Sequence, residues 1–70
     1  MIGTIIKVMD KGYGFIRSNS TEYFFHRDDL SSDINWIDLC MEVQNGAKVD
    51  VEFDEVASAK GPRAATVRRY

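Results

Sequence analysis

The chain has 70 residues, 44% of them hydrophobic, and a formal net charge of −2, which excludes a disordered chain and leaves room for one small domain. Its single cysteine, Cys40, excludes an internal disulfide and is typical of a reducing compartment. No apolar run is long enough to cross a membrane, and the first residues lack a secretory signal. We therefore expect one cytoplasmic domain over residues 1–70, beginning at a true start, Met1, and without a membrane partner.

The first half of the chain alternates apolar and polar residues over short runs, with turn-forming residues between them, which predicts strands. The four-residue loop Ser18–Thr21 would join two of these strands as an antiparallel hairpin. The expected elements are a strand over Gly3–Met9, a tight turn over Met9–Gly12, and strands over Tyr13–Arg17 and Glu22–His26.

The second half begins with a segment, Arg27–Gln44, whose apolar residues fit neither the helical nor the strand period. We expect a long irregular connection with short helical pieces, capped by Ser31, Ser32 or Asp33. The remaining elements are a turn at Asn45-Gly46, a strand over Lys48–Val56 with Val49, Val51 and Phe53 on one face, a loop over Ala57–Pro62, and a strand over Arg63–Arg69. Five short strands predict an all-β closed barrel, because closure removes exposed strand edges.

The predicted hairpin assigns each ring of the aromatic-rich stretch Lys11–Asp29 to one face. If Arg17 pairs with Glu22, Phe15 lies opposite Phe24 and Tyr13 opposite His26. Side chains alternate across a strand. Tyr13, Phe15, Phe24 and His26 then share one face, and Gly14, Ile16, Tyr23 and Phe25 share the other.

The face of Ile16 and Phe25 is the natural core, with the Tyr23 hydroxyl at its rim and Gly14 allowing another strand to approach. The predicted core residues are Ile5, Ile16, Phe25, Val49, Val51 and Val67. No amphipathic helix is available to cover the opposite face, so its four rings are expected at the surface. An exposed aromatic patch usually marks an interaction site, and rings among cations suit single-stranded nucleic acid. A dimer interface is the alternative.

Basic residues flank these rings and are candidates for phosphate contacts: Lys7, Lys11, Arg17, Arg27, Lys60 and Arg63. Acidic residues cluster elsewhere, in 28–38 and 50–55. His26 and Cys40 are the only soft ligands, so we expect no metal site. The chain has no nucleophile elbow and no phosphate-binding glycine loop, and we expect neither a cofactor nor enzymatic activity.

Five stretches resemble the bacterial cold-shock domain family, in order and over nearly the whole chain. "KGYGFI" (11–16) and "YFFHRDDL" (23–30) resemble its two RNA-binding motifs, the second of which usually reads V-F-V-H-F-S. The other three are "GTIIKV" (3–8), "NGAKVDVEF" (45–53) and "KGPRAATV" (60–67). The resemblance implies a five-stranded antiparallel OB-fold barrel that binds single-stranded RNA or DNA, with Tyr13, Phe15, Phe24 and His26 as the stacking residues.

The chain departs from the family pattern at several of these positions. Lys7-Val8 stands roughly where the family has a Trp-Phe pair, and Arg27, Arg63 and Thr66 replace the usual Phe, Gln and Asn. The longer segment 33–39 carries Trp36, the sole tryptophan, which either replaces a lost stacking residue or caps the open end of the barrel.

The resemblance implies an RNA chaperone or a regulator of transcription or translation, as a monomer or weak homodimer. The alternative is a protein-interaction or dimerisation module on the same barrel.

Overall fold

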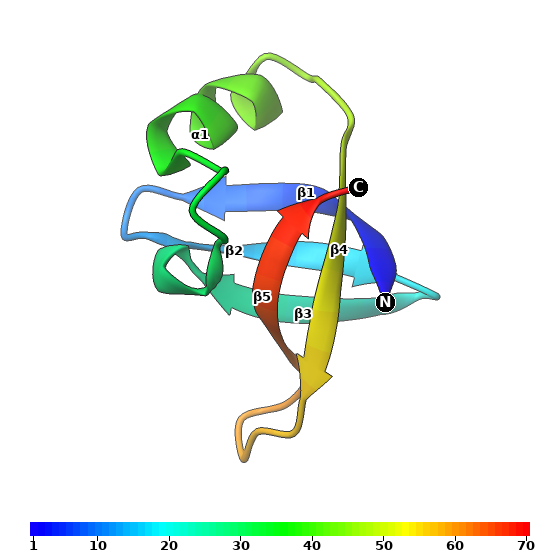
Figure 1. Ribbon diagram of the computed structural model, residues 1–70. Coiled ribbons are helices and arrows are strands. Elements are labelled where there is room, and N and C mark those ends of the chain that lie inside the picture. The colour runs from blue at the N-terminus through cyan, green and yellow to red at the C-terminus, as the bar shows by residue number, and fades with distance from the viewer.

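Five strands close into a barrel in the order β1-β2-β3-β5-β4, with one short α-helix at its upper end in Figure 1. The computed structural model describes residues 1–70. The elements are β1 (Ile2–Met9), β2 (Tyr13–Ser18), β3 (Thr21–His26), the 3₁₀ turn η1 (Arg27–Asp29), α1 (Trp36–Gln44), β4 (Val49–Val56) and β5 (Arg63–Arg69). The expected all-β, five-stranded OB-type barrel is confirmed. No helix is both long and apolar enough to span a membrane.

The β2–β3 hairpin has the predicted register, with Tyr13 opposite His26 and Phe15 opposite Phe24. Its loop is shorter than predicted. Only Asn19 and Ser20 lie outside the ladder, and both have positive φ, 52° and 68°, as in the two-residue turns that match strand twist. The paired strands therefore extend to Ser18 and Thr21. Because each strand is longer by one residue, the predicted pairs and the two faces of the hairpin stay the same.

Gly14 permits the close approach of β1 and the core, as expected. A Cβ atom at this position would lie 2.5 Å from the backbone oxygen of Lys7 and 2.8 Å from two ring atoms of Phe25. A β-bulge between Ile5 and Lys7 also bends β1 where it passes β2. Together the glycine and the bulge bring the strands into a tightly curved wall.

One neighbouring pair in the barrel, β3 and β5, is parallel rather than antiparallel. Phe24 pairs with Arg63, and an isolated parallel bridge joins Leu30 to Val67. The reason is the strand number: direction cannot alternate at every step around a ring of five strands. The Phe24 N–H also donates to the Pro62 carbonyl over 3.1 Å, which fixes the start of β5 beside the centre of β3.

The connection between β3 and β4 contains more regular structure than predicted. Asn35 caps the nine-residue helix α1, and its side chain accepts a hydrogen bond from the Asp38 N–H over 3.1 Å. The predicted caps were wrong: Ser31 instead donates its hydroxyl hydrogen bond to Asp33, which lowers the pKa of that carboxyl. The predicted turn at Asn45-Gly46 ends the helix, with Gly46 at φ 83°.

The core contains all six residues predicted for it, and Val49, Val51 and Phe53 share its face as expected. The complete buried cluster is Ile5, Ile16, Tyr23, Phe25, Ile34, Leu39, Val49, Val51, Phe53, Ala64 and Val67. Ile34 and Leu39 enter it from the connection and from α1, which closes the upper end of the barrel. Tyr23 buries its ring and donates its hydroxyl hydrogen bond to Glu55 over 3.2 Å, as predicted for the rim.

We expect the fold to lose stability in alkaline solution through Tyr23. Burial, and then the Glu55 carboxylate, raise the pKa of Tyr23, whereas an unfolded tyrosine titrates at about pH 10. The folded state therefore holds this proton more tightly, and the resulting stabilisation is complete below about pH 10 and is lost above it. Urea unfolding at pH 8 and pH 11 should show a smaller alkaline loss for Tyr23→Phe than for the wild type. An equal loss in both proteins would contradict this role.

Candidate nucleic-acid interface

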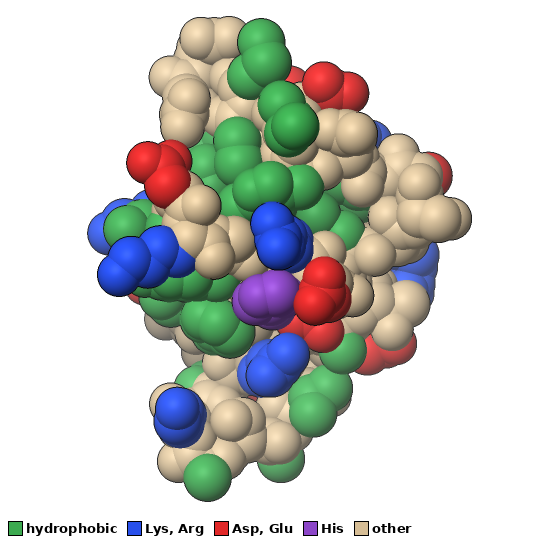
Figure 2. Space-filling model, turned by 90° about the vertical axis from the view of Figure 1, so that its left-hand side faces the viewer, with side chains coloured by type: hydrophobic (Ala, Val, Ile, Leu, Met, Phe, Trp, Pro, Cys, Tyr) green, Lys and Arg blue, Asp and Glu red, His purple; other side chains and the backbone are tan.

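Three aromatic rings and one imidazole share the outer face of β2 and β3, as the register predicted. We call Tyr13, Phe15, Phe24 and His26 the aromatic face; all four are half-buried. Tyr13 and Phe24 are stacked with ring centres 5.4 Å apart, and Phe15 lies edge-on to Phe24 at 6.0 Å. Figure 2 shows the histidine near the middle of this side of the molecule, with Lys or Arg side chains above and below it and hydrophobic side chains beside it.

A cavity of about 550 Å³ opens between the aromatic face and the β4–β5 loop. The loop supplies one wall, and its end is held by the hydrogen bond from Phe24 to Pro62. The lining residues are Phe15, Phe24, His26, Ser58, Lys60, Gly61, Pro62 and Arg63. Ser58, Gly61 and Pro62 were not predicted as site residues, although Gly61 and Pro62 belong to the quoted stretch "KGPRAATV".

The imidazole of His26 is oriented by the backbone that follows it. The imidazole Nδ1 accepts a hydrogen bond from the Asp28 N–H over 3.1 Å, and the backbone N–H of His26 donates to the Asp29 carboxylate over 2.9 Å. These two bonds form a capping box for η1. The neutral imidazole must then carry its proton on Nε2, which leaves this N–H as a donor for a ligand on the aromatic face.

The six predicted phosphate contacts fall into two groups. Arg17 pairs with Glu22 and Arg63 pairs with Asp29, each over 3.1 Å. The other four cations make no ion pair in the structure: Lys7, Lys11, Arg27 and Lys60.

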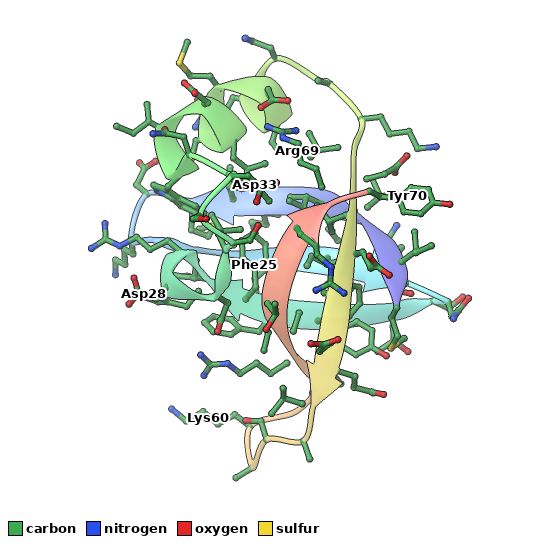
Figure 3. All side chains as sticks on the ribbon, viewed as in Figure 1. Phe25, Asp28, Asp33, Lys60, Arg69 and Tyr70 are labelled. Carbon is green, nitrogen blue, oxygen red and sulfur yellow. The ribbon has the colours of Figure 1, made fainter.

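Three of these free cations lie around the aromatic face, and the fourth, Lys11, is exposed in the turn between β1 and β2. Lys7 lies opposite Phe15 in the β1–β2 register. The side chain of Arg27 passes the turn at Gly12, where a Cβ atom would lie 3.3 Å from its Cδ. Figure 3 shows Lys60 extending from the β4–β5 loop toward the same side as Asp28, the side that faces the viewer in Figure 2. Positive charge is therefore available around the rings despite the net charge of the chain.

Trp36 lies at the start of α1 and packs against the core. Its ring is edge-on to the fully buried ring of Phe25, with centres 6.3 Å apart, and it does not line the cavity. This position is the one expected for a residue that caps the barrel. Contact between Trp36 and bases stays a prediction.

The remaining arginines connect parts of the fold on other sides of the molecule. Arg69 forms a two-pronged ion pair with Glu42 of α1, at 2.5 and 3.2 Å, and this hydrogen bonding raises the pKa of Arg69. Arg68 pairs with Glu52 across β4 and β5. Figure 3 places Arg69 beneath the helix. No group of three or more His, Cys, Asp or Glu side chains is placed to hold a metal ion.

Comparison with known proteins identifies the family. A model of the "'Cold-shock' DNA-binding domain" matches residues 1–70. A "Cold shock-like protein" of Aquifex aeolicus (strain VF5) is 43% identical over an alignment of 65 residues; the match covers 84% of this chain and 77% of that protein. Proteins of this family generally bind nucleic acid. The resemblance inferred from the two RNA-binding motifs is confirmed, and the chain belongs to the cold-shock domain family.

Proposed function

We propose that this protein binds single-stranded RNA or DNA by stacking bases on the aromatic face. The observation that carries the proposal is the gathering of Tyr13, Phe15, Phe24 and His26 on one side of the barrel, beside a cavity. Every base has a π-face, so stacking on such rings tolerates any sequence. Duplexes hide these faces inside their own stack and would be excluded.

The proposed mechanism needs only binding. Bases that stack on the protein are no longer available for pairing, so binding shifts RNA hairpins toward their open form, as any ligand of one state does. Lys7, Lys11, Arg27 and Lys60 would hold the phosphates that run beside the rings. This activity is that of an RNA chaperone. If the opened hairpin lies in a messenger RNA, the same activity would regulate translation. We assign the protein no catalytic step and expect it to act in the cytoplasm.

A labelled thymidine heptamer tests the proposal by fluorescence anisotropy. We expect saturable binding to the single strand, much weaker binding to the same heptamer within a duplex, and a lower melting temperature for a short RNA hairpin. The affinity for the single strand must fall on substitution of Phe24. Equal affinity for single strand and duplex would contradict base stacking, and would leave phosphate attraction as the only source of affinity.

The dependence on salt should separate the free cations from the paired ones. For single strands, the slope of log K against log salt is about −0.7 for each phosphate neutralised. Lys60→Gln should make the slope shallower by about 0.7, because Lys60 has no ion pair. Arg17→Gln should leave the slope unchanged, because Glu22 already offsets its charge. Equal changes in the two variants would contradict this division.

A protein-interaction module is the second candidate. The ion pairs of Arg17 and Arg63 offset two cations around the aromatic face, and apolar rings among neutral pairs also suit a protein surface. Sedimentation at several protein concentrations tests this candidate. Self-association that is abolished by Phe24→Ala, together with no oligonucleotide binding, would favour the interaction module over the nucleic-acid function.

A further inference from the structure

Arg63 occupies a position at the edge of the cavity that differs from that of the other basic residues. It is the first residue of β5 and the register partner of Phe24. The guanidinium carbon lies 5.8 Å from the centre of the Phe24 ring, and a guanidinium over a ring face is attracted by the ring quadrupole. Arg63 is therefore held against the ring on which we propose that a base stacks.

Asp29 fixes the orientation of this guanidinium. Its Oδ2 accepts hydrogen bonds from the His26 N–H over 2.9 Å and from Arg63 Nη2 over 3.1 Å. The Asp29 side chain is only 16% exposed, whereas that of Arg63 is 43% exposed. The backbone bond holds the carboxylate, and the carboxylate in turn holds one nitrogen of Arg63. The Nε hydrogen, both Nη1 hydrogens and the second Nη2 hydrogen have no acceptor in the protein, so one edge of the guanidinium keeps two adjacent free donors.

The chemistry of these free donors favours a base edge over a phosphate. Asp29 offsets much of the charge that would attract a phosphate, but it leaves adjacent N–H donors in one plane. Two adjacent donors match two adjacent acceptors, as in the contact of arginine with guanine O6 and N7. In a single strand all base edges are exposed, and cytosine offers a second such pair, N3 and O2. Adenine, thymine and uracil alternate donors with acceptors along the same edges.

We propose that Arg63, positioned by Asp29, makes the cavity selective for a base with two adjacent acceptors, guanine or cytosine. The inference rests on the proposed stacking function, because Phe24 must carry the base that Arg63 reads. Arg63 determines specificity, and Asp29 is a positioning residue that acts through it.

Four thymidine heptamers, with G, C, A or T at the central position, test the selectivity. We expect the G or C heptamer to bind about five- to tenfold more tightly than the T heptamer. This ratio lies at the lower end of the discrimination between bases that one paired-donor contact provides. The G and C heptamers together tell which base occupies the cavity. If none of the four binds, the proposed function itself fails. If all four bind equally, the function stands and the role of Arg63 is overturned.

Three substitutions connect the selectivity to the geometry. Arg63→Lys keeps the charge but loses the paired donors, so it should abolish the preference while it leaves the salt slope unchanged. Arg63→Gln offers one donor and one acceptor and should shift the preference toward adenine. Asp29→Asn still accepts from His26 but holds Arg63 less firmly, and it should reduce the preference without a matching loss of affinity for the T heptamer. Thermal unfolding of each variant confirms that it is folded. A preference that survives Arg63→Lys would overturn the inference.

Discussion

Ile16→Ala should lower the free energy of unfolding by about 2–5 kcal/mol, as truncations of fully buried aliphatic side chains do. Ile16 has no exposed surface and lies between Ile5 of β1 and Tyr23 of β3 in the barrel wall. The lost methyl groups would leave a cavity that the neighbouring strands cannot fill, because closure fixes their spacing. Urea unfolding followed by circular dichroism measures the loss.

The control for this prediction is the neighbouring residue on the N-terminal side. Phe15 precedes Ile16 but points to the outer face, where it is half-buried, so Phe15→Ala should destabilise the fold clearly less. Ile16→Val, which should cost about 0.5–1.5 kcal/mol, provides a folded variant if the alanine variant is too unstable to measure. A larger loss for Phe15→Ala than for Ile16→Ala would mean that the two faces of the hairpin are inverted.

Phe24→Ala should weaken single-strand binding by about 1–3 kcal/mol, the contribution of one stacked base. Phe24 stacks with Tyr13, contacts the edge of Phe15, lines the cavity and lies beside Arg63. It is therefore the residue whose removal disturbs most of the proposed surface. Anisotropy titration with the thymidine heptamer measures the loss of affinity.

Ile37→Ala is the matched control for Phe24→Ala. Ile37 is a large apolar residue with 68% of its surface exposed, on α1 and outside the cavity. Its removal should change neither stability nor affinity. Affinity that falls with Ile37→Ala and not with Phe24→Ala would move the binding surface from the aromatic face to the helix.

The strands and their faces could be predicted because local rules determined them. Alternation gave the core residues, and a short loop between two strands allowed only an antiparallel hairpin. The loop length was predicted wrongly, but the error was one residue on each side of the turn. Arg17 still pairs with Glu22, so the assignment of Phe15 and Phe24 to the outer face survived.

Other features had no distinctive signal in the sequence. Asn35 rather than Ser31, Ser32 or Asp33 caps α1, and the four polar residues before the helix offer the same capping chemistry. Thr66 adopts a positive φ of 51°, which is unfavourable for a β-branched residue, near the irregularity in the β4–β5 ladder. Nothing in its neighbours predicts this conformation.

The division of cations into free and paired ones also required the three-dimensional structure. Arg63 and Asp29 are far apart in the sequence, and β5 brings them together only where it closes the barrel against β3. The wall of the cavity formed by the β4–β5 loop has the same origin. Motif matching could name Lys60 and Arg63 as candidates, but it could not show which of them is already paired.

The most direct test of the account is an amide NMR titration of the ¹⁵N-labelled protein with the thymidine heptamer. If bases stack on the aromatic face, the largest shifts should fall on Tyr13, Phe15, Phe24 and His26 and on the loop from Ser58 to Arg63, while Ile37 and Met41 of α1 stay unchanged. Shifts confined to α1, or no shifts at heptamer concentrations far above that of the protein, would contradict the proposed function.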